Sequence, residues 1–177
     1  LSDPCLDVVG HRIPNYFVDR DSLDNKDELT NIGLLARDMA DDEALIIFPE
    51  GTRFSTEKLA KAISALSETA PTRVKSASEL RSVLPPRTAG TLAALAESNA
   101  DIVICNHVGI SDISSLQQLR AAVPLQTELK FKLWRTPRSE VNQTQFVQWL
   151  DAQWAIVDDW VTNNEDVTSP LSTPASF

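Results

Sequence analysis

The sequence contains few cysteines and no long apolar run, and each scarcity limits what the protein can be. Its 177 residues include two cysteines, Cys5 and Cys105, which lie far apart and show no metal-ligand spacing. This pattern favours two free thiols over a disulfide. No segment approaches the roughly 20 consecutive apolar residues of a membrane-spanning helix. The longest apolar run, at 44–48, has the length of a strand.

Basic residues are in the minority, with 16 Lys and Arg against 25 Asp and Glu, so the formal net charge is -9. This balance argues against nucleic acid as a partner, because phosphate backbones are bound by clustered Lys and Arg. It equally disfavours a polybasic membrane anchor. The sequence has no Gly-rich nucleotide loop and no group of residues with metal-ligand spacing. We therefore expect neither a metal nor a bound cofactor.

What the sequence does contain is typical of a globular domain, with 42% hydrophobic and 23% charged residues. The chain starts at Leu1, and its one methionine is Met39, so we expect an N-terminally truncated domain. We assign that domain to residues 1–161. Residues 162–177 are rich in Ser, Thr, Pro, Asn and acidic residues, and we expect a disordered tail there.

Hydrophobic periodicity predicts alternating helices and strands. The expected helices are 27–39, 56–66, 90–98, 114–122 and 144–161, with 67–82 helical in part. Ser55 or Thr56 is the expected N-cap of the second helix. The expected strands are 16–18, a buried strand at 44–48, 101–105 and a half-exposed strand at 129–134. This order predicts an α/β fold, a mainly parallel sheet flanked by helices. The four tryptophans are expected to pack in the core: Trp134, Trp149, Trp154 and Trp160.

The most informative segment is 48–55 (FPEGTRFS), where the predicted buried strand turns into a helix. Open α/β sheets place ligands at such strand ends. Gly51 permits unusual backbone geometry, and Thr52 with the N–H groups of the helix start can hold an anion. Arg53 offers a planar cation suited to phosphate. Glu50 can bond a substrate hydroxyl or pin Arg53. The alternative is an ordinary turn with one solvated ion pair.

The letters FPEGTR after an apolar run resemble the third motif of the glycerol-phosphate and lysophosphatidate acyltransferases. Residues 10–20 (GHRIPNYFVDR) look like the second motif of that family, with Arg20 at the position of its phosphate-binding arginine. Residues 83–87 (VLPPR) are similar to its fourth motif, which is centred on a proline. The resemblance covers roughly residues 1–161.

This resemblance implies an O-acyltransferase that moves a fatty acyl group from acyl-CoA or acyl-carrier protein to the free hydroxyl of lysophosphatidate. Arg20 and Arg53 would hold the acceptor phosphate, and Glu50, Gly51 and Thr52 would shape the site. The protein would work at a membrane surface, with its site facing the cytoplasm. Two alternatives stay open. One is a different acceptor, glycerol 3-phosphate or another lysophospholipid, and the other is a catalytically silent lipid-binding relative.

The family's catalytic motif is His-x4-Asp, in which the histidine takes the proton of the acceptor hydroxyl. Upstream of Arg20 the chain has only His11, and Tyr16 stands where the aspartate is required. We therefore expect the motif upstream of Leu1 and expect this chain alone to be inactive. His107 and Asp112 match the pattern but follow FPEGTR. We favour a structural or pocket-lining role for them over catalysis in a rearranged order.

Overall fold

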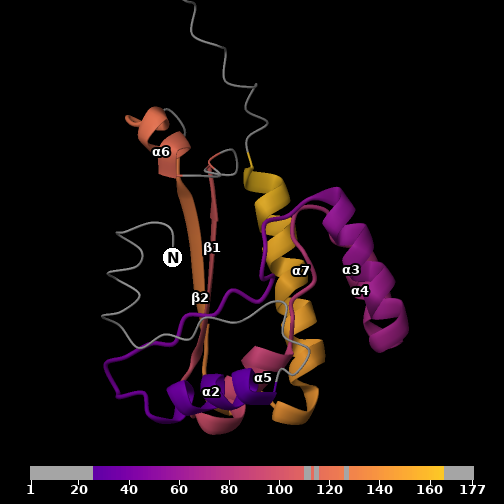
Figure 1. The fold of residues 1–177 in the computed structure, drawn as a ribbon, viewed down its shortest axis with the longest axis vertical. Coiled ribbons are helices and arrows are strands. Elements are labelled where there is room, and N and C mark those ends of the chain that lie inside the picture. The colour runs from indigo at the N-terminus through magenta and orange to yellow at the C-terminus, as the bar shows by residue number, and fades with distance from the viewer. Residues whose placement is uncertain (1–25, 110–112, 114–115, 126–127, 166–177) are drawn as a thin grey trace, which may run out of the picture.

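The computed structural model describes residues 26–109, 113, 116–125 and 128–165, and these residues are mostly helical (Figure 1). The elements, in chain order, are α2 (Lys26–Arg37), α3 (Thr56–Thr69), α4 (Val74–Ser78), α5 (Ala89–Glu97), β1 (Ile102–Val108), α6 (Leu116–Ala122), β2 (Lys130–Thr136) and α7 (Phe146–Asn164). Short 3-10 turns occupy Pro71–Arg73, Arg138–Glu140 and Gln143–Gln145.

The sheet in this part of the chain has two strands, and they are antiparallel. The register runs from Ile102 opposite Thr136 to Val108 opposite Lys130. The predicted mainly parallel α/β sheet is therefore wrong. The predicted strands at 101–105 and 129–134 exist, but they pair with each other rather than with strands before or between them.

The apolar run at 44–48 caused the error, because it forms no strand. Ile46 is 76% exposed and Phe48 is 81% exposed, so the run is not buried either. An apolar run reads as a buried strand only if a neighbouring strand accepts and donates its backbone hydrogen bonds. None of the described residues supplies that neighbour. The predicted strand at 16–18 lies outside the described residues.

The helix predictions were more accurate. Helices α2, α3, α5 and α6 lie where the periodicity placed them, within a few residues at each end. Ser55 is the N-cap of α3, and its Oγ accepts a hydrogen bond from the Lys58 backbone N–H at 3.3 Å. Helix α7 continues through Asn164, so the tail predicted from Thr162 starts too early.

Helix α7 lies between the two strands on one side and α3 with α4 on the other (Figure 1). It packs against the sheet on one side and against α4 on another. The buried apolar residues gathered around it are Leu80, Val83, Leu95, Ile104, Val141, Phe146, Leu150, Trp154 and Val157. Trp134 and Trp149 pack against this cluster, and Trp134 Nε1 donates to Gln153 Oε1 at 2.8 Å. The predicted packing role is confirmed for Trp134, Trp149 and Trp154, whereas Trp160 is half-buried and lies outside this cluster.

The outer face of the sheet is left open by the described residues. Side chains alternate along β1, so Ile104, Asn106 and Val108 are buried. The residues between them and their β2 partners point outward. Val103 is 55%, Phe131 60% and Leu133 62% exposed, and the free thiol of Cys105 lies on the same face.

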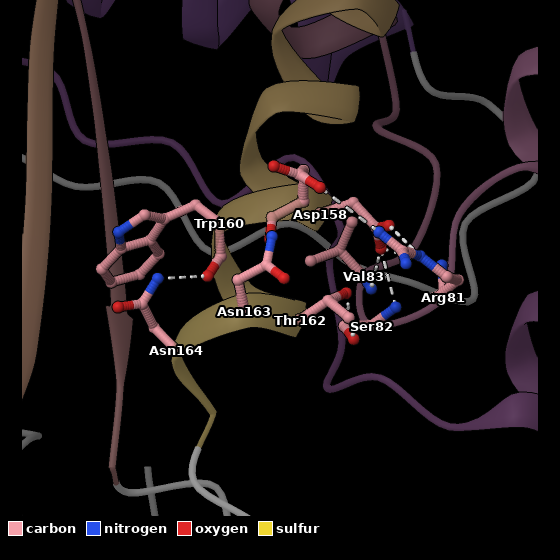
Figure 2. A network of polar contacts seen from close by, with 9 residues as sticks. Arg81, Ser82, Val83, Asp158, Trp160, Thr162, Asn163 and Asn164 are labelled. Carbon is pink, nitrogen blue, oxygen red and sulfur yellow. Dashed lines mark hydrogen bonds and ion pairs between the residues drawn. The ribbon is translucent and has the colours of Figure 1, made fainter.

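A buried carboxylate on α7 holds the segment 81–87, which precedes α5. Asp158 is only 3% exposed. Its Oδ1 accepts hydrogen bonds from the backbone N–H groups of Arg81 at 2.8 Å, Ser82 at 2.7 Å and Val83 at 3.2 Å (Figure 2). Because a buried charge is costly unless it is hydrogen-bonded, these three donors explain how the carboxylate is tolerated inside the protein.

An ion pair fixes the other end of the same segment. Arg73 donates from Nε and Nη2 to the two carboxylate oxygens of Asp151 on α7, at 2.8 and 2.6 Å. Its Nη2 also donates to the Pro86 carbonyl at 2.8 Å. Both side chains are largely buried. The 81–87 segment is thus tied to α7 near both of its ends.

We expect Asp158→Ala to lower the free energy of unfolding by at least about 3 kcal/mol, because three backbone N–H groups lose their acceptor. Urea denaturation measures the change. Asp159→Ala is the matched control. Its side chain is 71% exposed and reaches Arg81 only at 3.6 Å, so its effect should stay within about 0.5 kcal/mol. Equal losses in the two variants would contradict the role given to Asp158.

Candidate functional site

The segment singled out by the sequence forms a tight turn that leads into α3. The Gly51 N–H donates to the Phe48 carbonyl at 3.0 Å. Gly51 has a φ of +68°, in the left-handed region that side chains with a Cβ adopt at a cost. The glycine therefore has a backbone role, as predicted. We call residues 48–53 the 48–53 turn.

The 48–53 turn is held against the 81–87 segment by two hydrogen bonds. The Leu84 N–H donates to Glu50 Oε2 at 2.9 Å, and the Arg87 N–H donates to the Pro49 carbonyl at 2.9 Å. Two segments that the sequence analysis named separately, 48–55 and 83–87, thus form one unit. Glu50 bonds the backbone of this neighbour and makes no ion pair with Arg53 among the described residues.

Glu50 sits in an unfavourable environment for a charge. Burial raises the pKa of its carboxyl, the Leu84 N–H and the nearby Trp154 indole oppose that rise, and the charge of Asp158 adds to it. Trp154 Nε1 has no hydrogen-bond partner of good geometry within the described part of the chain. We therefore regard the indole as a nearby dipole and Leu84 as the true partner of Glu50.

Three cationic side chains surround the turn. Arg53 is exposed, and its guanidinium makes no hydrogen bond or ion pair with any described residue. Lys58 of α3 donates from Nζ to Thr52 Oγ1 at 2.9 Å and to the Arg53 carbonyl at 3.0 Å. Arg87 is exposed, and its guanidinium lies against Gly51, where a Cβ would be 3.4 Å from Arg87 Cζ. In a chain of net charge -9, this is a local concentration of positive charge.

Lys58 and Arg87 were missed as site residues by the sequence analysis. Arg87 was quoted only as the last letter of VLPPR. Its proximity to Gly51 depends on a contact between segments more than thirty positions apart, which periodicity does not reveal. Lys58 could have been predicted from its position. It lies one helical turn after the N-cap Ser55, where a long side chain can reach back over the start of its helix.

The other predicted site residues are Arg20, His107 and Asp112. Arg20 and Asp112 lie outside the described residues. His107 lies on the outward, exposed face of β1, with its ring 6.1 Å from that of Phe131. That face is opposite to the one that packs on α7, and the 48–53 turn contacts the 81–87 segment on α7. His107 is therefore not placed to serve the turn.

The part of the chain that the structure describes gives two further observations. No group of three or more His, Cys, Asp or Glu side chains there is arranged to hold a metal ion. None of the helices in that part of the chain combines the length and apolarity needed to cross a bilayer. Comparison of the chain with protein-family models, with curated proteins and with solved structures gives no match.

The raised pKa of Glu50 predicts a pH dependence of stability. Above its ordinary pKa of 4.5, the unfolded chain loses this proton while the folded protein still holds it. The free energy of unfolding should therefore lose a Glu50-dependent part as the pH rises from below 4.5 through the raised pKa. Glu50→Gln does not titrate and should lack this part.

Urea denaturation of both proteins across this pH range tests the prediction. The stability of the wild type minus that of Glu50→Gln should fall with rising pH and then become constant. A difference that stays flat or grows with pH would show that the Glu50 pKa is not raised in the folded protein.

Proposed function

We propose that this chain serves acyl transfer from acyl-CoA or acyl-carrier protein to the free hydroxyl of lysophosphatidate, and that the 48–53 turn binds the phosphate of the acceptor. The proposal combines the resemblance of FPEGTR with the geometry of the turn. Its main support is Arg53, an exposed guanidinium with no partner among the described residues, on a turn whose backbone is fixed.

A fixed turn matters because phosphate binding by a guanidinium depends on orientation. The planar fork of arginine binds two phosphate oxygens at once. Arg53 follows a turn closed by the Gly51 hydrogen bond and anchored through Pro49 and Glu50. Its own carbonyl and Thr52 are held by Lys58. Little backbone entropy then remains to be lost when the acceptor binds.

The proposed reaction needs no covalent enzyme intermediate. A base removes the proton from the acceptor hydroxyl as its oxygen attacks the thioester carbonyl. The C–S bond breaks, an ester forms, and the thiolate leaves and takes up a proton. Glu50 is a poor choice for the base, because its carboxylate is committed to the Leu84 N–H. The sequence expectation of a His-x4-Asp pair upstream of Leu1 remains our proposal for this role.

Because the proposed acceptor and product are lipids, we propose that the protein works at a membrane surface, with its site facing the cytoplasm. The described helices offer no span for attachment.

We expect Arg53→Ala to weaken binding of a short-chain, monomeric lysophosphatidate by about 10- to 100-fold, the range for a lost charge-assisted hydrogen-bond pair. Isothermal titration calorimetry on the purified chain measures the dissociation constants. Arg120→Ala is the matched control, because it removes the same charge from an exposed residue on α6. Equal affinity in wild type and Arg53→Ala would rule out the phosphate site at the turn.

A turnover assay with acyl-CoA distinguishes acceptor binding from catalysis. The purified chain is expected to bind lysophosphatidate without releasing CoA from acyl-CoA, because its one described histidine, His107, faces away from the turn. Release of CoA that His107→Ala abolishes would overturn this and make His107 the base.

A further inference from the structure

We propose that Arg87 is a second phosphate-binding residue at the 48–53 turn, and that it selects acceptors carrying a phosphate monoester over those carrying a phosphodiester. The inference rests on the proposed function, because it assigns a residue and a selectivity to the same site. The 83–87 segment entered the sequence analysis only as a proline motif, with no ligand given to its arginine.

The pairing of the other arginines makes Arg87 unusual. In this acidic chain, most described guanidinium groups have protein partners: Arg37 with Glu97, Arg73 with Asp151, Arg81 with Asp158 and Asp159, Arg135 with Asp101, and Arg138 with the Val141 carbonyl. Within the described residues, the guanidinium groups of Arg53, Arg87 and Arg120 have none. Arg120 lies on α6, whereas Arg53 and Arg87 both belong to the turn and the segment that clamps it.

The position of Arg87 is set by the fold rather than by a flexible loop. Its own N–H is bonded to the Pro49 carbonyl. The preceding carbonyl, that of Pro86, accepts from Arg73, which is itself fixed on Asp151. The guanidinium then lies against Gly51, two residues before Arg53. Two guanidinium groups that lack acidic partners thus belong to the 48–53 turn and to the segment bonded to it, and the proposed anion would bind both.

Lys58 does not take this role. Its Nζ already donates to Thr52 Oγ1 and to the Arg53 carbonyl. Lys58 therefore supports the backbone on which Arg53 stands, with one ammonium N–H left over, whereas the guanidinium groups of Arg53 and Arg87 have no partner among the described residues.

Two guanidinium forks suit one kind of phosphate. A phosphate monoester carries a charge of about -1.5 to -2 at neutral pH and three strong acceptor oxygens. A phosphodiester carries one charge and two unesterified oxygens, so one guanidinium satisfies it. The second fork gains most from the additional charge and oxygen of the monoester. Arg87 should thus contribute to the affinity for glycerol 3-phosphate or lysophosphatidate and little to that for a diester headgroup.

The test compares a soluble matched pair of ligands, glycerol 3-phosphate and its methyl phosphodiester, by calorimetry on the purified chain. Wild type should prefer the monoester. Arg87→Ala should weaken monoester binding by about tenfold or more and leave diester binding nearly unchanged, so the preference collapses. Arg87→Lys keeps the charge and loses the planar guanidinium, so its monoester affinity should lie between those of the wild type and Arg87→Ala. Arg120→Ala should behave as wild type.

Three other results would overturn the inference, and they are distinguishable. If wild type binds neither ligand, the proposed function fails with it. If Arg53→Ala loses the monoester while Arg87→Ala keeps wild-type affinity and preference, the phosphate site stands and only Arg87 is excluded. If Arg87→Ala weakens both ligands equally, the residue supports the turn and does not select. Thermal unfolding checks that each variant is folded. If Arg87→Ala does not fold, the ligand preference of Arg87→Lys decides whether Arg87 selects the monoester.

Discussion

The buried carboxylate of Asp158, on α7, accepts hydrogen bonds from the backbone N–H groups of three successive residues at the start of the 81–87 segment. That segment in turn holds the 48–53 turn through Leu84 and Arg87. The 48–53 turn therefore depends on the 81–87 segment for its position, and that segment depends on α7. An exposed turn of this kind would lose much more conformational freedom on binding a ligand if this support were absent.

Charged side chains are distributed around the same 81–87 segment. Asp158 and Glu50 lie close enough for the charge of one to raise the pKa of the other, and both are used to bind backbone N–H groups of one segment. Some of the arginines around them form ion pairs that build the fold, such as Arg73 with Asp151. Others, Arg53 and Arg87, have guanidinium groups without a partner among the described residues. An acidic protein can therefore present a local anion site without a high overall positive charge.

Local features of this fold were predictable from the sequence, and long-range ones were not. The N-cap at Ser55, the periodicity of α7 and the backbone role of Gly51 depend on neighbouring residues, and each was predicted correctly. The run at 44–48 failed because burial of a strand depends on a partner elsewhere in the chain. Arg87 was missed for the same reason, since its place beside Gly51 follows from the Pro49 and Asp151 contacts.

NMR mapping of the binding site tests most directly whether a phosphate binds at the 48–53 turn. Glycerol 3-phosphate titrated into the labelled chain should shift the backbone amide signals of Gly51, Thr52, Arg53 and Arg87 together, with a single dissociation constant. The amides of β1 around His107 should not move. Shifts centred on β1, or no shifts at millimolar ligand, would contradict the account.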